Sequence, residues 1–122
     1  MSPHDERPEL LAQPRLFGRE VEGARCPSCG RSTAPAIPRC PWCGSLTDSA
    51  RFEATGVTWA STVLHIPVGG RRPPYGLAYV DLRDGPRVLV LHGREGPIPI
   101  GTIVRLVPSA NPDAWAEIEE AL

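Results

Sequence analysis

Four cysteines, arranged in two equally spaced pairs, are the residues of this sequence best suited to chemistry. Cys26-Pro-Ser-Cys-Gly30 recurs 14 positions later as Cys40-Pro-Trp-Cys-Gly44. In each pair two thiolates lie on the same side of a tight turn, and the trailing glycine allows the positive φ that the turn needs. Two such knuckles facing each other complete a tetrahedral sulfur site suited to zinc. The spacing therefore predicts one zinc ion bound by Cys26, Cys29, Cys40 and Cys43.

The same cysteine motif also occurs in proteins with other chemistry. Cys-Pro-x-Cys-Gly resembles the rubredoxin knuckle, which suggests an iron electron carrier, and Cys-x-x-Cys can also be a redox-active pair. Rubredoxins space their knuckles further apart than the ten residues between Cys29 and Cys40. Four protein sulfurs leave no coordination position for water or substrate, so we expect a structural zinc. Such an ion contributes on the order of 10–16 kcal/mol of apparent binding energy, enough to order a segment without a core of its own.

Residues able to catalyse a reaction by themselves are scarce outside the cysteines. The sequence has histidines at 4, 65 and 92, but no Gly-x-Ser-x-Gly motif and no glycine-rich phosphate loop. Each histidine is more typical of a surface or hydrogen-bonded residue than of a base. The sequence therefore does not indicate an enzyme that acts alone.

One loop has the composition of a ligand-binding segment. In Pro67-Val-Gly-Gly-Arg-Arg-Pro-Pro74, two arginines follow a Gly-Gly hinge, and their forked donors suit phosphates. Arg71 and Arg72 are thus candidate ligand-binding residues, with a solvated hairpin tip as the alternative. Tyr75 and Tyr79 either stack on a ligand or belong to the sheet.

The elements that must position these residues are mostly strands. Short runs rich in Val, Ile, Thr and Leu, bounded by Gly and Pro, predict strands near 56–66, 75–82, 86–92 and 102–107. Asp84-Gly85 between two apolar runs supplies the positive φ of a hairpin. The first strand changes the parity of its apolar residues, which a bulge in a small closed barrel would explain.

The predicted fold is therefore mainly β, with an N-terminal zinc ribbon followed by a small OB-fold-like Greek-key barrel and a short C-terminal helix. We expect a proline-rich arm over 1–21, the ribbon over 22–50, the barrel over 51–110 and the helix over 111–122. The helix prediction comes from Asn111 as a cap, Pro112 as the first helical residue, and an apolar stripe of Trp115, Ile118 and Leu122.

Composition limits the class of protein. The 122 residues carry 13 basic side chains, all arginine, and a net charge of −1, which lacks the basic footprint of a nucleic-acid binder. No run approaches the roughly 20 apolar residues of a membrane span, and the polar start is unlike a signal peptide. We therefore expect a soluble, cytoplasmic protein, in whose compartment the cysteines stay reduced.

The motifs taken together resemble a known family, in which a rubredoxin-like zinc ribbon is joined to an acyl-CoA-associated OB-fold. The resemblance implies a non-catalytic subunit that stabilises an enzyme and helps to form its acyl-CoA channel. It implies a thiolase-like partner, including lipid-transfer-protein-type thiolases and aldolases, with MaoC-type enoyl-CoA hydratases as the alternative. The segments that carry it, in order, are Cys26–Gly30, Ile37–Ser45, Thr55–Val57, Pro74–Leu82 and Ile100–Val104.

A function of another class competes with this one. A zinc ribbon joined to an OB-fold also suits an adaptor for RNA or single-stranded DNA. The near-neutral charge and the absence of lysine argue against it. The favoured hypothesis is an accessory subunit of an acyl-CoA enzyme.

Overall fold

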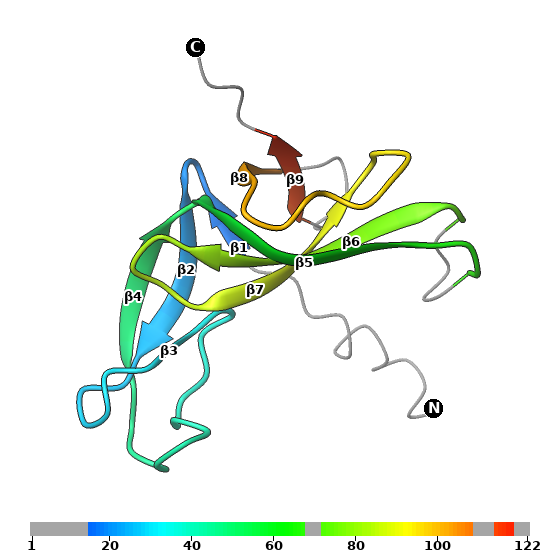
Figure 1. Ribbon diagram of the computed structural model, residues 1–122. Coiled ribbons are helices and arrows are strands. Elements are labelled where there is room, and N and C mark those ends of the chain that lie inside the picture. The colour runs from blue at the N-terminus through cyan, green and yellow to red at the C-terminus, as the bar shows by residue number, and fades with distance from the viewer. Residues whose placement is uncertain (1–14, 68–71, 109–113, 119–122) are drawn as a thin grey trace.

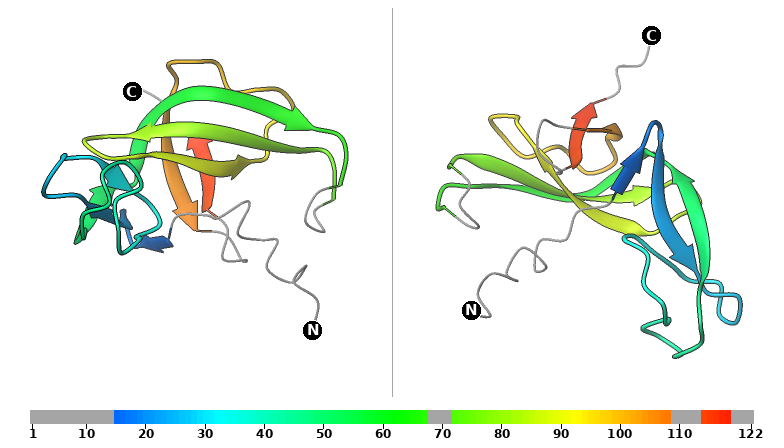
Figure 2. Two further views of the ribbon diagram at one scale, coloured as in Figure 1. Left: turned by 90° about the horizontal axis from the view of Figure 1, so that it is seen from below. Right: turned by 180° about the vertical axis from the view of Figure 1, so that it is seen from behind.

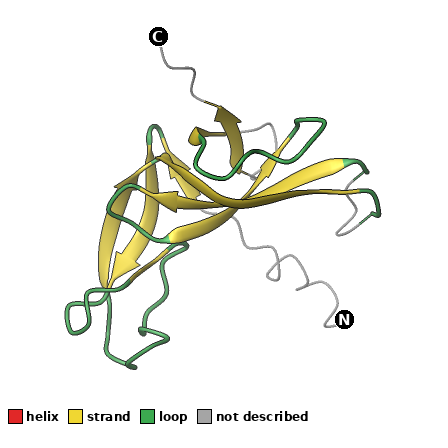
Figure 3. Ribbon diagram, viewed as in Figure 1, coloured by secondary structure: helices red, strands yellow, loops and turns green. Residues whose placement is uncertain are grey.

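The computed structural model describes residues 15–67, 72–108 and 114–118, and every element in those ranges is a β-strand (Figure 1, Figure 3). The strands form two sheets, an N-terminal one next to the cysteines and a closed barrel after it. None of the described segments forms a helix of the length and hydrophobicity needed to cross a bilayer. The predicted arrangement of a ribbon followed by a barrel is confirmed.

The N-terminal sheet is built around β2 (Glu20–Arg25), which pairs with all three of its neighbours in antiparallel fashion. β1 (Arg15–Phe17) and β3 (Ser32–Thr33) pair with successive parts of one edge of β2, and β4 (Asp48–Glu53) runs along the other. The predicted boundary between arm and ribbon at 21/22 falls inside β2, and the one between ribbon and barrel at 50/51 falls inside β4. The division into domains stays a prediction.

The barrel contains five strands in the order β5-β6-β7-β9-β8, closed by pairing of β5 with β8. Only the β7–β9 pair is parallel among these described strands. Numbered within the barrel, the order is 1-2-3-5-4, which is that of an OB-fold-like Greek key. Figure 2 shows the long β5 curving around the barrel. The strands are β5 (Thr55–Leu64), β6 (Tyr75–Leu82), β7 (Arg87–His92), β8 (Ile103–Pro108) and β9 (Ala114–Ile118).

Two local predictions about the barrel can be compared with the structure. The register of β5 against β6 shifts between Thr58 and Ala60, which is the expected bulge and leaves Trp59 as the extra residue. The hairpin between β6 and β7 is also present, but its positive φ of 51° falls on Asp84 and not on Gly85. A Cβ on Gly85 would lie 2.9 Å from the ring of Phe52, so glycine is needed there for packing.

The predicted C-terminal helix is wrong over residues 114–118, where the chain forms β9; residues 111–113 and 119–122 lie outside the described ranges. β9 pairs with β8 along five residues and with β7 at Leu91. A short helix gains little by itself, whereas a strand here satisfies backbone groups on two open edges. Ala116 is buried and Glu117 exposed, as strand alternation requires.

The hydrophobic core is shared by the two sheets. Val21 from β2 and Phe52 from β4 belong to the same buried cluster as the inward side chains of the barrel. Since β4 and β5 are separated only by the buried Ala54, the N-terminal sheet continues into the barrel wall. The barrel part of the cluster includes Ala78, Val80, Leu82, Val88, Val90, Val104 and Leu106.

Candidate metal centre

The two cysteine knuckles have the same backbone geometry. In the first, the Gly30 amide donates to Cys26 O at 2.8 Å and the Cys26 amide to Arg31 O at 2.8 Å. In the second, Gly44 donates to Cys40 O at 2.9 Å and Cys40 to Ser45 O at 2.8 Å. Gly30 and Gly44 both have a φ of 79°, a conformation that favours glycine. The internal repeat in the sequence is thus a repeat in structure.

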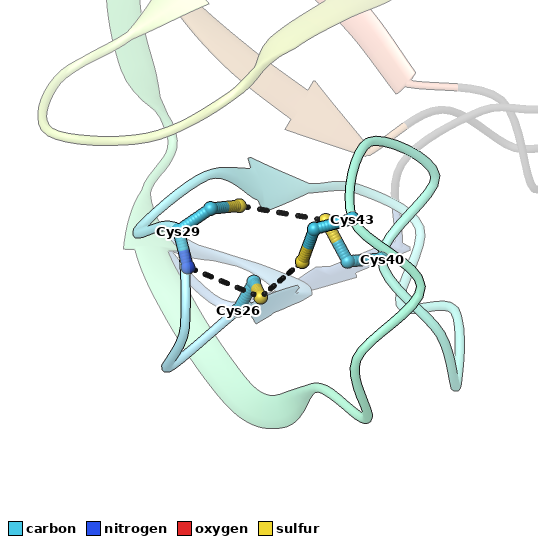
Figure 4. A group of neighbouring side chains, drawn as sticks. All are labelled: Cys26, Cys29, Cys40 and Cys43. Carbon is cyan, nitrogen blue, oxygen red and sulfur yellow. Dashed lines mark hydrogen bonds between the residues drawn. The ribbon is translucent and has the colours of Figure 1, made fainter.

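The knuckles bring their four sulfurs together. Figure 4 shows the side chains pointing toward one another from the two loops. The Sγ atoms of Cys26 and Cys43 lie 3.5 Å apart and those of Cys29 and Cys40 3.6 Å apart, and all four lie within 4.8 Å of one another. These separations are far beyond the ~2.05 Å of a disulfide. They are close to the ~3.8 Å edge of a tetrahedron whose centre lies about 2.3 Å from each sulfur, the usual Zn–S distance.

The protonation of the cluster also indicates a cation. Hydrogen bonds from the Ser45 hydroxyl and amide lower the pKa of Cys43 to about 6. The hydrogen bond from the Arg31 backbone lowers the pKa of Cys29, but burial and hydrogen bonds with the other thiols outweigh it and raise that pKa to about 11. Four thiolates this close repel one another, so the sulfurs share protons unless a cation balances their charge. The residues therefore fit a divalent metal with a preference for sulfur.

A metal in this site would be structural. Cys26 and Cys40 are buried while Cys29 and Cys43 are exposed, so the site lies at the surface of the ribbon. Four protein ligands fill a tetrahedral ion, which leaves no position for a water or a substrate to react. A metal bound here would order the two loops that contain the cysteines.

Trp42, inside the second knuckle, is 55% exposed. The guanidinium carbon of Arg31 lies 5.1 Å from its ring centroid, so the aromatic side chain connects the two knuckles on their outer side. Trp42 therefore lies at the surface of the ribbon and does not pack into the core.

The other predicted site residues are dispersed. Arg72 is exposed, and Arg71 and His4 lie outside the described residues. His65 is exposed at the end of the first barrel strand, whereas Tyr75 is buried. The structure therefore brings together the four cysteines, and it does not test the loop that contains the two arginines.

His92 is fully buried and is engaged at both ring nitrogens. The Arg94 amide donates to its Nδ1 at 3.3 Å, so Nε2 carries the proton and donates to Ser61 Oγ at 3.0 Å. Ser61 Oγ also accepts from the Ile98 amide at 2.9 Å. Burial lowers the pKa of His92, and Arg94 adds to that effect. His92 is thus a neutral structural residue without a free lone pair for base catalysis.

Sequence reasoning missed an aromatic group on the outer wall of the barrel. We call Val57, Trp59, Tyr79 and Ile103 the outer-face cluster; their exposed fractions lie between 44% and 52%. Trp59 and Tyr79 meet edge to face with centroids 5.9 Å apart. Arg87 stacks 3.7 Å above the Trp59 ring and donates twice to Asp81, at 2.6 and 3.2 Å. Strand alternation was the available signal, because Trp59 lies two residues after Val57 and shares its outward face.

Comparison with known proteins identifies the family. Neither a family model nor a curated protein matches this chain. Among solved structures, the one described as "Ltp2-ChsH2(DUF35) aldolase" is 30% identical in sequence with a TM-score of 0.64, over 82% of this chain and 85% of that one. The chain belongs to the DUF35 family. A second DUF35 protein, of unknown function from Sulfolobus solfataricus, has 18% identity and a TM-score of 0.60 over 82% and 76% of the two chains.

Proposed function

We propose that this DUF35 protein is a non-catalytic accessory subunit of an acyl-CoA enzyme in the cytoplasm, with a thiolase-like or lipid-transfer-protein-type subunit as its partner. The observation that carries the proposal is the 30% identity over most of both chains to a structure that joins a DUF35 component with an aldolase. The metal proposed for Cys26, Cys29, Cys40 and Cys43 is one structural zinc. The partner supplies the catalysis, and this chain stabilises it and lines part of its acyl-CoA channel.

The outer-face cluster is the surface that we assign to the partner. It combines Trp, Tyr and Arg side chains, which are the types that contribute most to binding at protein interfaces. Its charges are already balanced, because Arg87 is held by Asp81 and Arg105 by Glu117 at 3.6 Å. A phosphate backbone needs unpaired cations, so this face suits an uncharged protein surface better than a nucleic acid.

Co-expression with thiolase-like enzymes of the same organism tests the proposal. We expect a stable complex whose enzyme loses activity or solubility when this chain is omitted. A monomeric protein next to a fully active enzyme would contradict the accessory role, and assembly with a MaoC-type hydratase instead would change the partner.

A matched pair of tryptophans tests the surface. Trp59→Ser should weaken assembly by about tenfold or more, whereas Trp42→Ser, an equally exposed tryptophan on the ribbon, should not. The reverse result would move the interface to the knuckles and leave the accessory role intact. Retained zinc and an unchanged melting temperature serve as the controls for folding.

Arg71 and Arg72 are proposed to bind the phosphate end of the CoA thioester in the assembled complex. Charge-assisted hydrogen bonds from two forked cations contribute roughly 1.5–3 kcal/mol each when shielded from water. Replacing both by Ala should therefore raise the KM of the complex for acyl-CoA by about tenfold or more, at about 1.4 kcal/mol per decade. An unchanged KM would make the loop a solvated hairpin tip, and lost assembly would place the arginines against the partner.

A further inference from the structure

The repeat of the knuckles extends one residue further back, to an arginine before each pair. Arg25 Nη1 donates to Gly30 O at 3.1 Å, and Arg39 Nη1 donates to Gly44 O at 3.0 Å. Each arginine thus binds the carbonyl of the glycine that follows the second cysteine of its own knuckle. The two side chains are equivalent in this respect.

They differ in what else they reach. The second nitrogen of Arg25, Nη2, donates at 2.8 Å to the carbonyl of Asp84, 59 residues away at the tip of the β6–β7 hairpin. That hairpin extends over the N-terminal sheet in Figure 1. Within the described part of the chain, the hydrogen bond of Arg39 stays inside its own knuckle. One guanidinium therefore joins the first knuckle to the barrel, and its counterpart does not.

Besides Arg25, the hairpin is held at its base by the Arg83 amide, which donates to Thr55 O at 3.1 Å, and by an exposed ion pair of Arg83 with Glu53 at 3.5 Å. The Arg25 guanidinium lies 5.5 Å from the centroid of Phe52, and a Cβ at Gly23 or Gly85 would come within 3 Å of the same ring. Beside these contacts is an open cavity of about 260 Å³, so apolar packing does not enclose the tip. Its lining consists of Arg25, Arg51, Phe52, Glu53, Arg83 and Asp84.

We propose that Arg25 couples the metal centre to the barrel by holding the hairpin Arg83–Gly85 against the first knuckle. The inference rests on the proposed zinc site, because a metal on Cys29 fixes the position of the neighbouring Gly30 carbonyl. The planar guanidinium of Arg25 binds both Gly30 O and Asp84 O, so a fixed Gly30 carbonyl also fixes the position of the hairpin. The coupling is reciprocal: a hairpin held in place also favours the metal-bound knuckle.

Hydrogen exchange of the Gly85 amide, which donates to Leu82 O at 3.1 Å, reports directly on the hairpin. In the wild-type chain, removal of zinc by a chelator should speed this exchange by about tenfold. Arg39→Ala should show the same response. In Arg25→Ala the exchange should already be fast with zinc bound, and chelation should change it little. Amides of the barrel core, such as Val80, provide the internal reference.

A second variant covers the case in which Arg25→Ala does not fold. Arg25→Lys keeps the charge but places it on a single ammonium, which lacks the planar fork, and it should behave as Arg25→Ala. Persistence of the chelation response in either Arg25 variant, or its absence in the wild type, would overturn the coupling. Failure of the zinc proposal is separate, since it appears as a chain that contains no zinc before any variant is made.

Discussion

The cysteine loops and the barrel hold their shapes by different means. Between Cys26 and Thr47 the buried residues are Cys26 and Cys40, and the other side chains are exposed or half-buried. The barrel, in contrast, encloses a continuous set of aliphatic side chains. A segment that buries so little apolar surface cannot offset its conformational entropy by packing. We therefore expect the cysteine loops, and not the barrel, to depend on a bound metal.

The two regions also share part of their structure. β2 and β4 flank the cysteine loops in sequence, yet Val21 and Phe52 lie in the barrel core. The part that we expect to depend on metal is accordingly about 26–47, within the predicted ribbon of 22–50. The paired strands β2 and β4 form a base on which the loops are mounted.

The largest effect should come from removing one metal ligand. Cys40→Ser leaves three sulfurs and forfeits most of the roughly 10–16 kcal/mol of apparent zinc binding. We expect the 26–47 amides to lose protection from hydrogen exchange while the amides of β5 to β8 keep theirs. Ser28→Ala, an exposed position inside the first knuckle that retains all four ligands, is the matched control. Simultaneous loss of protection in every strand would show that the two regions fold as one unit.

The two phenylalanines test whether the hydrophobic core of the barrel extends into the N-terminal sheet. Phe52 is 5% exposed and lies in the shared core, whereas Phe17 is 45% exposed on β1. Phe52→Ala should lower the free energy of unfolding by about 3–5 kcal/mol, and Phe17→Ala by less than about 1 kcal/mol. Chemical denaturation measures both. Equal effects would mean that the core does not extend into the N-terminal sheet.

A smaller, pH-dependent effect should be confined to the barrel. Burial lowers the pKa of His92 in the folded chain, so its neutral form stabilises the protein at pH values above the unfolded pKa of about 6.5. This contribution is lost as the pH falls below that value toward the lower folded pKa. The stability difference between wild type and His92→Gln should therefore shrink from pH 7.5 to pH 5.5, and subtraction removes the effect of zinc release. A constant difference would contradict the assignment.

The sequence predicted these features where local chemistry determines them. The glycine after each cysteine pair predicted both knuckles. The apolar runs around Asp84-Gly85 predicted the β6–β7 hairpin. The strand at 114–118 could not be found in the same way, because its pairing with β7 and β8 depends on edges that exist only in the closed barrel. The hydrogen bond from Arg25 to Asp84 likewise joins residues 59 positions apart, and no local pattern marks it.

Metal analysis of the full-length chain, produced without added metal, tests the difference between the two regions most directly. Elemental analysis combined with native mass spectrometry should give one zinc per chain for the wild type, and Cys40→Ser should contain none. A zinc-free wild type with ordered cysteine loops, or a red iron-containing protein as the native state, would contradict the account.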